Sequence, residues 1–144
     1  MAKADRLRVV VDDSYVSALG RAAYVFAVLE WNAVWCCERM EANYIRRLAR
    51  KTAGQIAKDL VRLAKRRPPG DREEFLGAAL ELEQLVTLRN GIFHGKPGTA
   101  PDGAQRLFHA GRAWSVELLE DAADQFAQCS TRLNALLYGP LKER

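Results

Sequence analysis

The chain contains 144 residues, of which 49% are hydrophobic, and it carries a net charge of +4. This length is sufficient to bury one core and too short for two domains of ordinary size, so we expect a single domain spanning residues 1–144. The modest positive charge favours a polyanionic partner without requiring one. The two histidines are far apart in the sequence and no pair of Cys-x-x-Cys units occurs, so neither a metal site nor a cofactor is predicted.

The first residues of the chain and its cysteines allow a prediction of the cellular compartment of the protein. The polar segment Met1–Arg6 lacks the apolar run of a secretion signal. The cysteine count is odd, and the adjacent Cys36 and Cys37 point too far apart on a helix to form a disulfide easily. We therefore expect a cytoplasmic protein with reduced cysteines and no attachment to a membrane.

The first predicted helix begins at one of the capping residues at positions 12–14 and continues to about Arg50, with a possible break. Its apolar residues recur at spacings of three and four, and a second set widens this stripe around most of the helix. This pattern is typical of a helix that is buried on more than one side. Because the apolar stretch Ala22–Cys37 is too short for a membrane span and contains Glu30, we expect a subunit interface there.

Glu30 is the one charged residue between Ala22 and Cys37. A carboxylate in apolar surroundings must be paired or protonated, and one role for it is to orient Arg89 or His94. An ordinary structural ion pair with another arginine explains it at least as well.

The second predicted helix begins at the capping-box sequence Thr52–Gln55 and runs to about Arg67, where two prolines and a glycine force a turn. Basic side chains follow its outer side, namely Lys58, Arg62, Lys65 and Arg66. They could neutralise phosphates along an RNA backbone. A row of this kind is also typical of a solvated surface, and no aromatic residues interleave with it to stack on bases.

The third predicted helix opens at Asp71 and extends to His94, because Gly95 followed by Pro97 is the usual signal for a helix C-terminus. Gly91 interrupts good helix formers at a cost of about 1 kcal/mol relative to alanine. Such a glycine often marks a close approach of backbones, and we expect a second copy of this helix to pack there.

Three polar residues gather at the end of this helix. At about 100° per residue, Asn90 and His94 lie one turn apart on one face, and the long side chain of Arg89 can swing toward them. Arginine keeps its charge and binds phosphate through a planar set of donors. The three groups together therefore indicate phosphate chemistry. The alternative is an arginine that lies along the surface and a histidine that caps the helix end.

The segment after the helix changes character. Gly95–Gly103 is rich in glycine and proline and is predicted to form a loop. Lys96, beside the polar residues, could help to hold a phosphate, or it is an ordinary surface lysine.

A short β-hairpin is predicted over Arg106–Trp114, with its turn at Ala110-Gly111 and His109 at the surface. The last helix is predicted to begin near Ser115 and to end at Gly139. Four substantial helices with short connections favour an all-α protein. We expect an up-and-down four-helix bundle, with this hairpin before the last helix.

The sequence Arg89-Asn90-Gly91-Ile92-Phe93-His94, late in an all-helical pattern, resembles the signature of the HEPN superfamily. The resemblance implies a small all-α metal-independent ribonuclease, in which the signature helices of two protomers meet across a homodimer. It implies catalytic roles for Arg89, Asn90 and His94, with RNA as the substrate. It also implies a toxin restrained by an antitoxin protein, or a component of defence against phage.

In the mechanism that this resemblance suggests, His94 of one protomer removes the proton from a ribose 2′-hydroxyl, and His94 of the other protonates the leaving 5′-oxygen. Arg89 stabilises the charge on the phosphoryl oxygens, and Asn90 hydrogen-bonds an imidazole or a non-bridging oxygen. Two alternatives stay open. One is a non-catalytic dimer of the same type that binds RNA, a nucleotide or a partner protein, and the other is a purely structural subunit.

Overall fold

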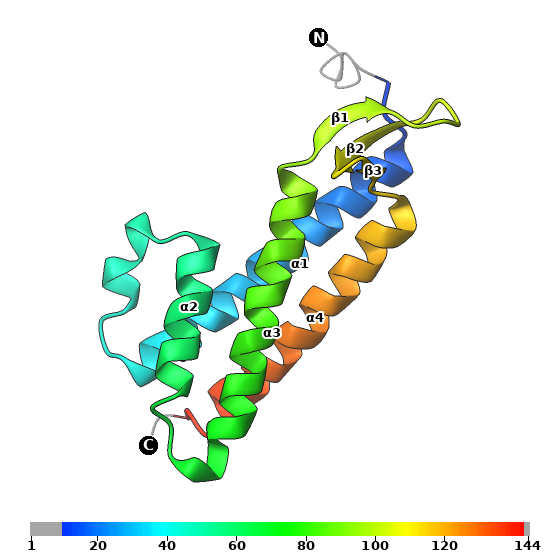
Figure 1. The fold of residues 1–144 in the computed structure, drawn as a ribbon. Helices are drawn as coiled ribbons and strands as arrows, with labels where there is room; N and C mark the ends of the chain where they lie inside the picture. The colour runs from blue at the N-terminus through cyan, green and yellow to red at the C-terminus, as the bar shows by residue number, and fades with distance from the viewer. Residues whose placement is uncertain (1–9, 143–144) are drawn as a thin grey trace.

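The computed structural model describes residues 10–142, and these form a mostly helical fold with one small antiparallel sheet. Helices α1 (Asp13–Met40), α3 (Pro69–Phe93) and α4 (Val116–Tyr138) run side by side along the length of the molecule (Figure 1). The shorter helix α2 (Ala53–Ala64) covers only the half that is distant from the sheet. The predicted helical class is therefore confirmed, with the sheet at one end as an addition.

Helix α1 ends well before the predicted limit at Arg50. Directly after it, Asn43 adopts a φ of 70°, and the Glu38 carboxylate accepts hydrogen bonds from the backbone nitrogens of Asn43 and Ile45 at 2.8 and 3.1 Å. A side chain that binds backbone donors in this way offers the chain an alternative to continuing the helix. The chain then forms the 3-10 helix η2 (Ile45–Arg50). The predicted break thus lies directly after α1.

The other helices start where capping signals occur in the sequence. The Thr52 side chain accepts a hydrogen bond from the Gln55 backbone, and the Gln55 side chain accepts one from the Thr52 backbone, so the predicted capping box is confirmed. Helix α3 begins slightly before the predicted Asp71, because proline is tolerated in the first turn. The Ser115 hydroxyl caps α4 by accepting a hydrogen bond from the Leu118 backbone at 3.1 Å.

The sheet contains β1 (Lys96–Thr99), β2 (Gln105–His109) and β3 (Arg112–Ala113), all antiparallel, in the order β1-β2-β3. The two turn residues between β2 and β3, Ala110 and Gly111, both have positive φ, as a tight two-residue hairpin requires. The predicted hairpin is confirmed.

The prediction of a loop over Gly95–Gly103 was wrong in its first part, which forms β1. Pro97 is tolerated because β1 is an edge strand, where one backbone donor is not needed by the sheet. Gly98 faces the Phe108 ring of β2, and a Cβ atom built there would lie 3.0 Å from that ring. Glycine therefore lets the aromatic ring cover the strand, a contact that composition alone does not reveal.

Helices α1 and α4 form the most extensive helix pair, and they run parallel. Phe26 packs edge-on against Phe126 with ring centroids 5.1 Å apart, and the Asn32 amide donates to the Ser130 hydroxyl at 2.8 Å. Helices α1 and α2 also run in the same direction (Figure 1), because η2 and its flanking turns carry the chain back between them. A regular up-and-down four-helix bundle, with helices that alternate in direction along the chain, is not confirmed.

The three cysteines lie in the core and form no disulfide. Burial raises the pKa of each thiol, in Cys36, Cys37 and Cys129, to about 12, so these thiols are poor nucleophiles at neutral pH. Each helix within residues 10–142 is too short or too polar to span a membrane.

Candidate functional site

The Arg89 side chain is half-buried at the end of α3. Its guanidinium carbon lies 5.3 Å from the ring centroid of Phe26 on α1 and 5.8 Å from that of Phe93. One nitrogen donates a hydrogen bond to the Asn90 amide oxygen at 2.9 Å. Within residues 10–142 the guanidinium forms no ion pair, so most of its five N–H donors stay available to an anion.

His94 closes α3 and exposes its side chain to solvent. Its backbone nitrogen bonds the Asn90 carbonyl oxygen at 2.9 Å, which places the two residues one helical turn apart on the same face. Asn90 is in turn bonded to Arg89. Arg89, Asn90 and His94 therefore follow one another around the last turn of one helix, with Arg89 bonded to Asn90 and His94 exposed.

Gly91 is buried, and the neighbour that requires its small size belongs to the same chain. The Trp114 indole nitrogen donates to the Gly91 carbonyl oxygen at 2.9 Å, and a Cβ atom on Gly91 would lie 3.3 Å from the Trp114 ring. The close approach at Gly91 is made by the side chains of Trp114 and His109 and not by a second backbone, so the sheet and the residue that follows it occupy the position where we expected a second copy of the helix. The expectation for a second copy at Gly91 is therefore corrected.

His109 is the residue that sequence reasoning missed. It is exposed, as predicted, yet its ring lies 3.5 Å from the position of a Cβ atom on Gly91. Because Gly91 and His94 are three residues apart on a helix, their Cβ positions are about 5–6 Å apart. Both histidines of the chain thus lie at the same end of α3. No local pattern in the sequence signalled this proximity, because Gly91 and His109 are 18 residues apart and lie in different elements.

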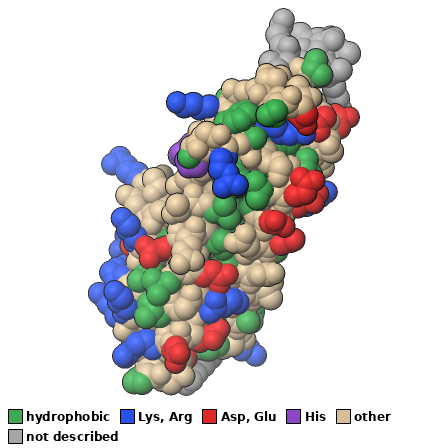
Figure 2. Space-filling model, turned by 45° about the vertical axis from the view of Figure 1, so that its right-hand side comes forward, with side chains coloured by type: hydrophobic (Ala, Val, Ile, Leu, Met, Phe, Trp, Pro, Cys, Tyr) green, Lys and Arg blue, Asp and Glu red, His purple; other side chains and the backbone are tan. Residues whose placement is uncertain are grey.

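A cavity of about 320 Å³ opens beside His109, between the hairpin and the start of α4. Arg112, Trp114 and Leu118 are among the residues that line it. Figure 2 shows a histidine side chain at the surface of this end of the molecule, with lysine or arginine side chains near it. An imidazole, a guanidinium and an indole around one hollow can bind a planar or anionic group.

The sheet is also anchored to the start of α1. The Leu107 backbone nitrogen donates to the buried Tyr15 hydroxyl at 3.0 Å, and the Arg106 guanidinium lies 4.3 Å from the Tyr15 ring centroid while it pairs with Asp12. Hydrogen bonds from Ser14 and then from Arg106 lower the pKa of Asp12 to about 2. The sheet therefore bridges α1 and α3 and fixes the end of the molecule that carries Arg89 and His94.

Two supporting residues were predicted for this site, and within residues 10–142 neither has a side chain that is hydrogen-bonded or ion-paired to it. Lys96 is the exposed first residue of β1, and no hydrogen bond or ion pair joins its side chain to the rest of the described chain. Glu30 follows Phe26 by one turn of α1, so it lies on the side of α1 that faces Arg89. Among residues 10–142, however, no hydrogen bond or ion pair links Glu30 to Arg89 or His94.

The basic residues predicted to track RNA lie on α2 and directly after it, away from the sheet (Figure 1). Arg62 is engaged with Glu41 and Asp59 at 3.4 and 3.6 Å, and its hydrogen bond lowers the pKa of Glu41. The exposed side chains are Lys58, Lys65 and Arg66. Three of the four predicted cations are therefore accessible to a polyanion. They lie away from the end of the molecule that carries His94.

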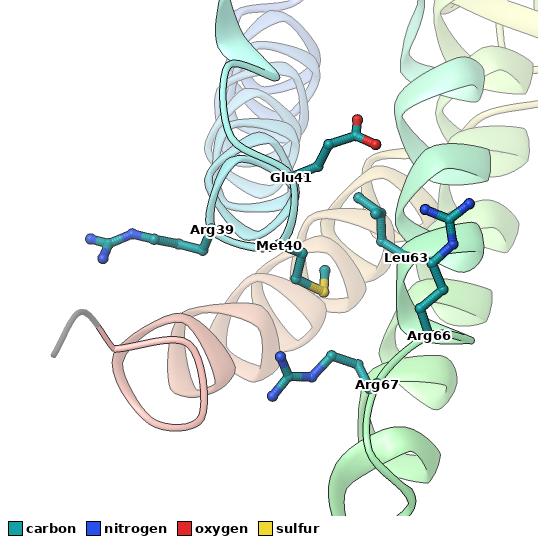
Figure 3. Close-up of a pocket in the computed structure, with 6 residues that line it drawn as sticks. All are labelled: Arg39, Met40, Glu41, Leu63, Arg66 and Arg67. Atoms are coloured by element: carbon teal, nitrogen blue, oxygen red, sulfur yellow. The ribbon is translucent and has the colours of Figure 1, made fainter.

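Two hollows lie near these cations. Lys58 and Lys51 are among the residues that line an open depression of about 490 Å³. The other hollow, of about 300 Å³, is shown in Figure 3, where Arg66 and Arg67 at the end of α2 face Met40 and Glu41 at the end of α1. Arg67 is already committed to Asp71 at 2.6 Å. Neither hollow brings together the groups that an acid–base reaction needs.

Comparison with known proteins found no match to this chain among family models, curated proteins or solved structures. At the end of α3 the Arg89 guanidinium is bonded to the Asn90 amide, and the exposed His94 follows Asn90 by one helical turn. That combination can bind a phosphate and move a proton beside it.

Proposed function

We propose that the protein is a metal-independent endoribonuclease of the HEPN type, with Arg89, Asn90 and His94 as its catalytic residues. The observation that carries the proposal is the Arg89 guanidinium, held by the Phe26 and Phe93 rings and by Asn90. A cation that is positioned in advance and has no acidic partner among the described residues is suited to the charge that develops on a phosphate during cleavage.

The reaction requires one group that takes a proton and one that gives a proton. His94 of one protomer removes the proton of the ribose 2′-hydroxyl, whose oxygen attacks the adjacent phosphorus atom. The bond from phosphorus to the 5′-oxygen breaks, and the imidazolium of the second protomer's His94 protonates that oxygen. The products are a 2′,3′-cyclic phosphate and a 5′-hydroxyl end, and none of these steps uses a metal.

Arg89 and Asn90 have separate parts in this scheme. Arg89 donates to the non-bridging oxygens, which carry more negative charge in the transition state than in the substrate. Asn90 already accepts a hydrogen bond from Arg89, so its NH₂ group is left to donate to a non-bridging oxygen or to an imidazole. The homodimer that brings two His94 residues to one phosphate is part of the proposal.

The test is an incubation of purified protein with total RNA in EDTA, followed by detection of cyclic phosphate ends. We expect cleavage by the parent protein and a loss of roughly 100-fold or more in His94→Ala, because a general acid–base group contributes about 10²–10⁴-fold. Arg89→Lys should lose a similar factor, since lysine keeps the charge but not the planar donors. RNA with 2′-O-methyl groups should resist cleavage.

The matched control is Gln84→Ala, because Gln84 is an exposed residue of the same helix away from the polar cluster. It should cleave as well as the parent. The proposal fails if His94→Ala cleaves RNA at the parental rate, or if fragments appear equally in all variants, which would indicate a contaminating nuclease.

A second candidate function is a non-catalytic HEPN-like dimer that binds RNA, a nucleotide or a partner protein. The observation that favours it is the exposure of Tyr24 and Trp31 on α1, 72% and 49%, which is unusual for large aromatic residues of a monomer. Binding of RNA without fragments in the EDTA assay would select this function.

The biological role that accompanies the leading proposal is that of a toxin held by an antitoxin protein, or of a defence component. Expression of the parent protein should then slow cell growth, while expression of His94→Ala should not. Equal growth with both proteins would count against this role and leave the cleavage reaction to be judged by the RNA assay.

A further inference from the structure

The proposed mechanism leaves the cavity beside His109 without a role. Its volume of about 320 Å³ is at the lower end of the range for pockets that bind small organic groups. It is lined by His109, Ala110, Arg112, Ala113, Trp114 and Leu118. Most of these side chains are apolar, and one of them carries a guanidinium. The cavity therefore suits a flat apolar group with polar atoms on its edge better than it suits a bare phosphate.

The indole of Trp114 is held in place before any ligand binds. Its nitrogen donates to the Gly91 carbonyl oxygen at 2.9 Å, so the ring cannot turn without breaking this bond. The side chain is half-buried and lines the cavity. Single-stranded RNA is bound through bases that stack on aromatic rings of this kind, and each stacked base strengthens binding by roughly 5- to 150-fold. Trp114 thus offers a fixed ring for a nucleobase.

Arg112 supplies donors for the edge of such a base. It is exposed, and within residues 10–142 its guanidinium forms no ion pair. A guanidinium presents two parallel N–H groups, which bind best to two neighbouring acceptors. Guanine carries such a pair in O6 and N7, whereas adenine has a donor beside its N7. Arg112 therefore favours guanine over adenine.

The backbone of Ala113 adds an acceptor at the same place. Strands β2 and β3 pair Phe108 with Ala113, and the Trp114 backbone nitrogen donates to the Leu107 carbonyl oxygen at 2.8 Å. Because bonded and non-bonded pairs alternate along an antiparallel ladder, the Ala113 N–H and C=O groups point away from β2. No further strand of residues 10–142 lies on that side of β3. The Ala113 carbonyl oxygen is thus open to the N1–H or amino group of a guanine.

The cavity lies close to the candidate catalytic residues. The rings of Trp114 and His109 come within 3.3 and 3.5 Å of the position of a Cβ atom on Gly91. His94 follows Gly91 by three residues, so these two Cβ positions are about 5–6 Å apart. The ribose carbon that carries the 2′-hydroxyl is bonded to the carbon that carries the base. A base in the cavity therefore belongs to the nucleotide whose 2′-hydroxyl meets His94, on the 5′ side of the cleaved bond.

We propose that this cavity binds a guanine base, and that the protein consequently cleaves RNA on the 3′ side of guanosine. The base stacks on Trp114, O6 and N7 accept hydrogen bonds from Arg112, and the Ala113 carbonyl oxygen accepts one from the base. The cleavage position rests on the proposed ribonuclease function, whereas the binding of guanine is measured without cleavage.

The first test is isothermal titration calorimetry with guanosine 3′-monophosphate, which has no bond for the enzyme to cleave. Its Kd should be at least roughly 5-fold lower than those of the adenosine, cytidine and uridine 3′-monophosphates, as a bidentate arginine contact provides. Arg112→Lys should abolish the preference, because lysine keeps the charge but not the planar donors. The matched control is Arg50→Lys on η2, an exposed position far from the sheet, which should bind as the parent does. Equal affinity for the four nucleotides overturns the proposal.

A second variant tests whether the base enters the cavity. Leu118 is 41% exposed and lines the cavity, so Leu118→Trp should fill it and weaken binding of guanosine 3′-monophosphate by roughly 10-fold or more. The control is Leu80→Trp, the same change at a leucine that is 45% exposed on α3, about three turns before Gly91. Far-ultraviolet circular dichroism should show parental helix content in both variants. Unchanged binding in Leu118→Trp overturns the proposal.

The third test is cleavage of oligouridine that contains one guanosine, adenosine or 7-deazaguanosine. The parent should cleave after guanosine at least roughly 5-fold faster than after adenosine. It should also cleave after guanosine faster than after 7-deazaguanosine, which lacks N7. In Arg112→Ala the rates after guanosine and 7-deazaguanosine should be equal, because the contact to N7 is already lost. A difference that persists in Arg112→Ala overturns the role of Arg112.

These experiments distinguish a failure of this proposal from a failure of the ribonuclease proposal. Cleavage without a preference for guanosine overturns the guanine site and leaves the ribonuclease function intact. Preferential binding of guanosine 3′-monophosphate by a protein that cleaves no RNA overturns the ribonuclease function and leaves the guanine site. A protein that neither cleaves RNA nor prefers guanosine 3′-monophosphate overturns both.

Discussion

The indole nitrogen of Trp114 donates a hydrogen bond to the Gly91 carbonyl oxygen, 2.9 Å away, and this contact joins the end of the sheet segment to the end of α3. Carbonyl groups in the last turn of a helix have no partner within the helix. The Trp114 ring also fills the space that a side chain at position 91 would occupy. The contact therefore explains both the glycine inside the motif and the position of His109 beside it.

Alanine substitutions at two helical glycines test this packing. Gly20→Ala on the exposed side of α1, where a Cβ atom meets nothing within 4 Å, should stabilise the protein by about 0.5–1 kcal/mol. Gly91→Ala places its Cβ atom 3.3 Å from the Trp114 ring, and overpacking costs about 1–3 kcal/mol, which removes or reverses that gain. Urea unfolding measures both, and equal stabilisation by the two variants would show that Trp114 does not constrain Gly91.

Substitution of His109 tests which histidine supplies the second imidazole of the proposed reaction. With His94 of two protomers as acid and base, His109→Gln should keep RNA cleavage within about threefold of the parent, while His94→Gln loses roughly 100-fold or more. The measurement is the initial rate with a fluorescent RNA oligonucleotide between pH 5 and 8. A loss in His109→Gln that equals the loss in His94→Gln, with one limb of the pH profile missing, would assign the second proton transfer to the same chain.

Asp12 makes the attachment of the sheet to α1 dependent on pH. Its pKa is lowered to about 2 in the folded protein, so its contribution to stability is complete above the unfolded pKa near 4 and is lost as the pH falls through about 2. Asp12→Asn should therefore be less stable than the parent at pH 7, and the two unfolding midpoints should converge as the pH approaches 2. A constant difference between pH 7 and pH 2 would contradict the ionic contribution of Asp12.

Variants of the basic residues on α2 and directly after it distinguish a role in RNA binding from a role in stability. Replacement of Lys58, Lys65 and Arg66 by alanine should lower the slope of log Kd against log salt for single-stranded RNA by about 2, since each phosphate contact contributes about 0.7. Arg62→Ala should instead lower the unfolding midpoint, because it leaves Glu41 without that partner. An unchanged salt slope in the triple variant would show that RNA does not follow α2.

The candidate site was predictable to the extent that it is local. Asn90 and His94 are one turn apart in any helix, and the hydrogen bond from Arg89 to Asn90 joins neighbours in the sequence. The Phe26 ring beside Arg89 was not predictable in the same way, since the packing of α1 on the rest of the fold brings it there. The contact suggested between Glu30 and Arg89 or His94 depended on a distance across the fold in the same way, and within residues 10–142 no hydrogen bond or ion pair forms it.

Short-range chemistry in the sequence determined the helices, the capping box at Thr52, the turn at Ala110-Gly111 and the spacing within the motif, because each depends on residues within a turn or two of one another. The tertiary structure alone decided that α1 and α4 run parallel and that β1 pairs with β2. It also decided that His109 meets Gly91 and that Tyr24 and Trp31 remain uncovered. These outcomes depend on side chains that are far apart in the sequence and compete for one core, and hydrophobic periodicity does not reveal which neighbour each face will find.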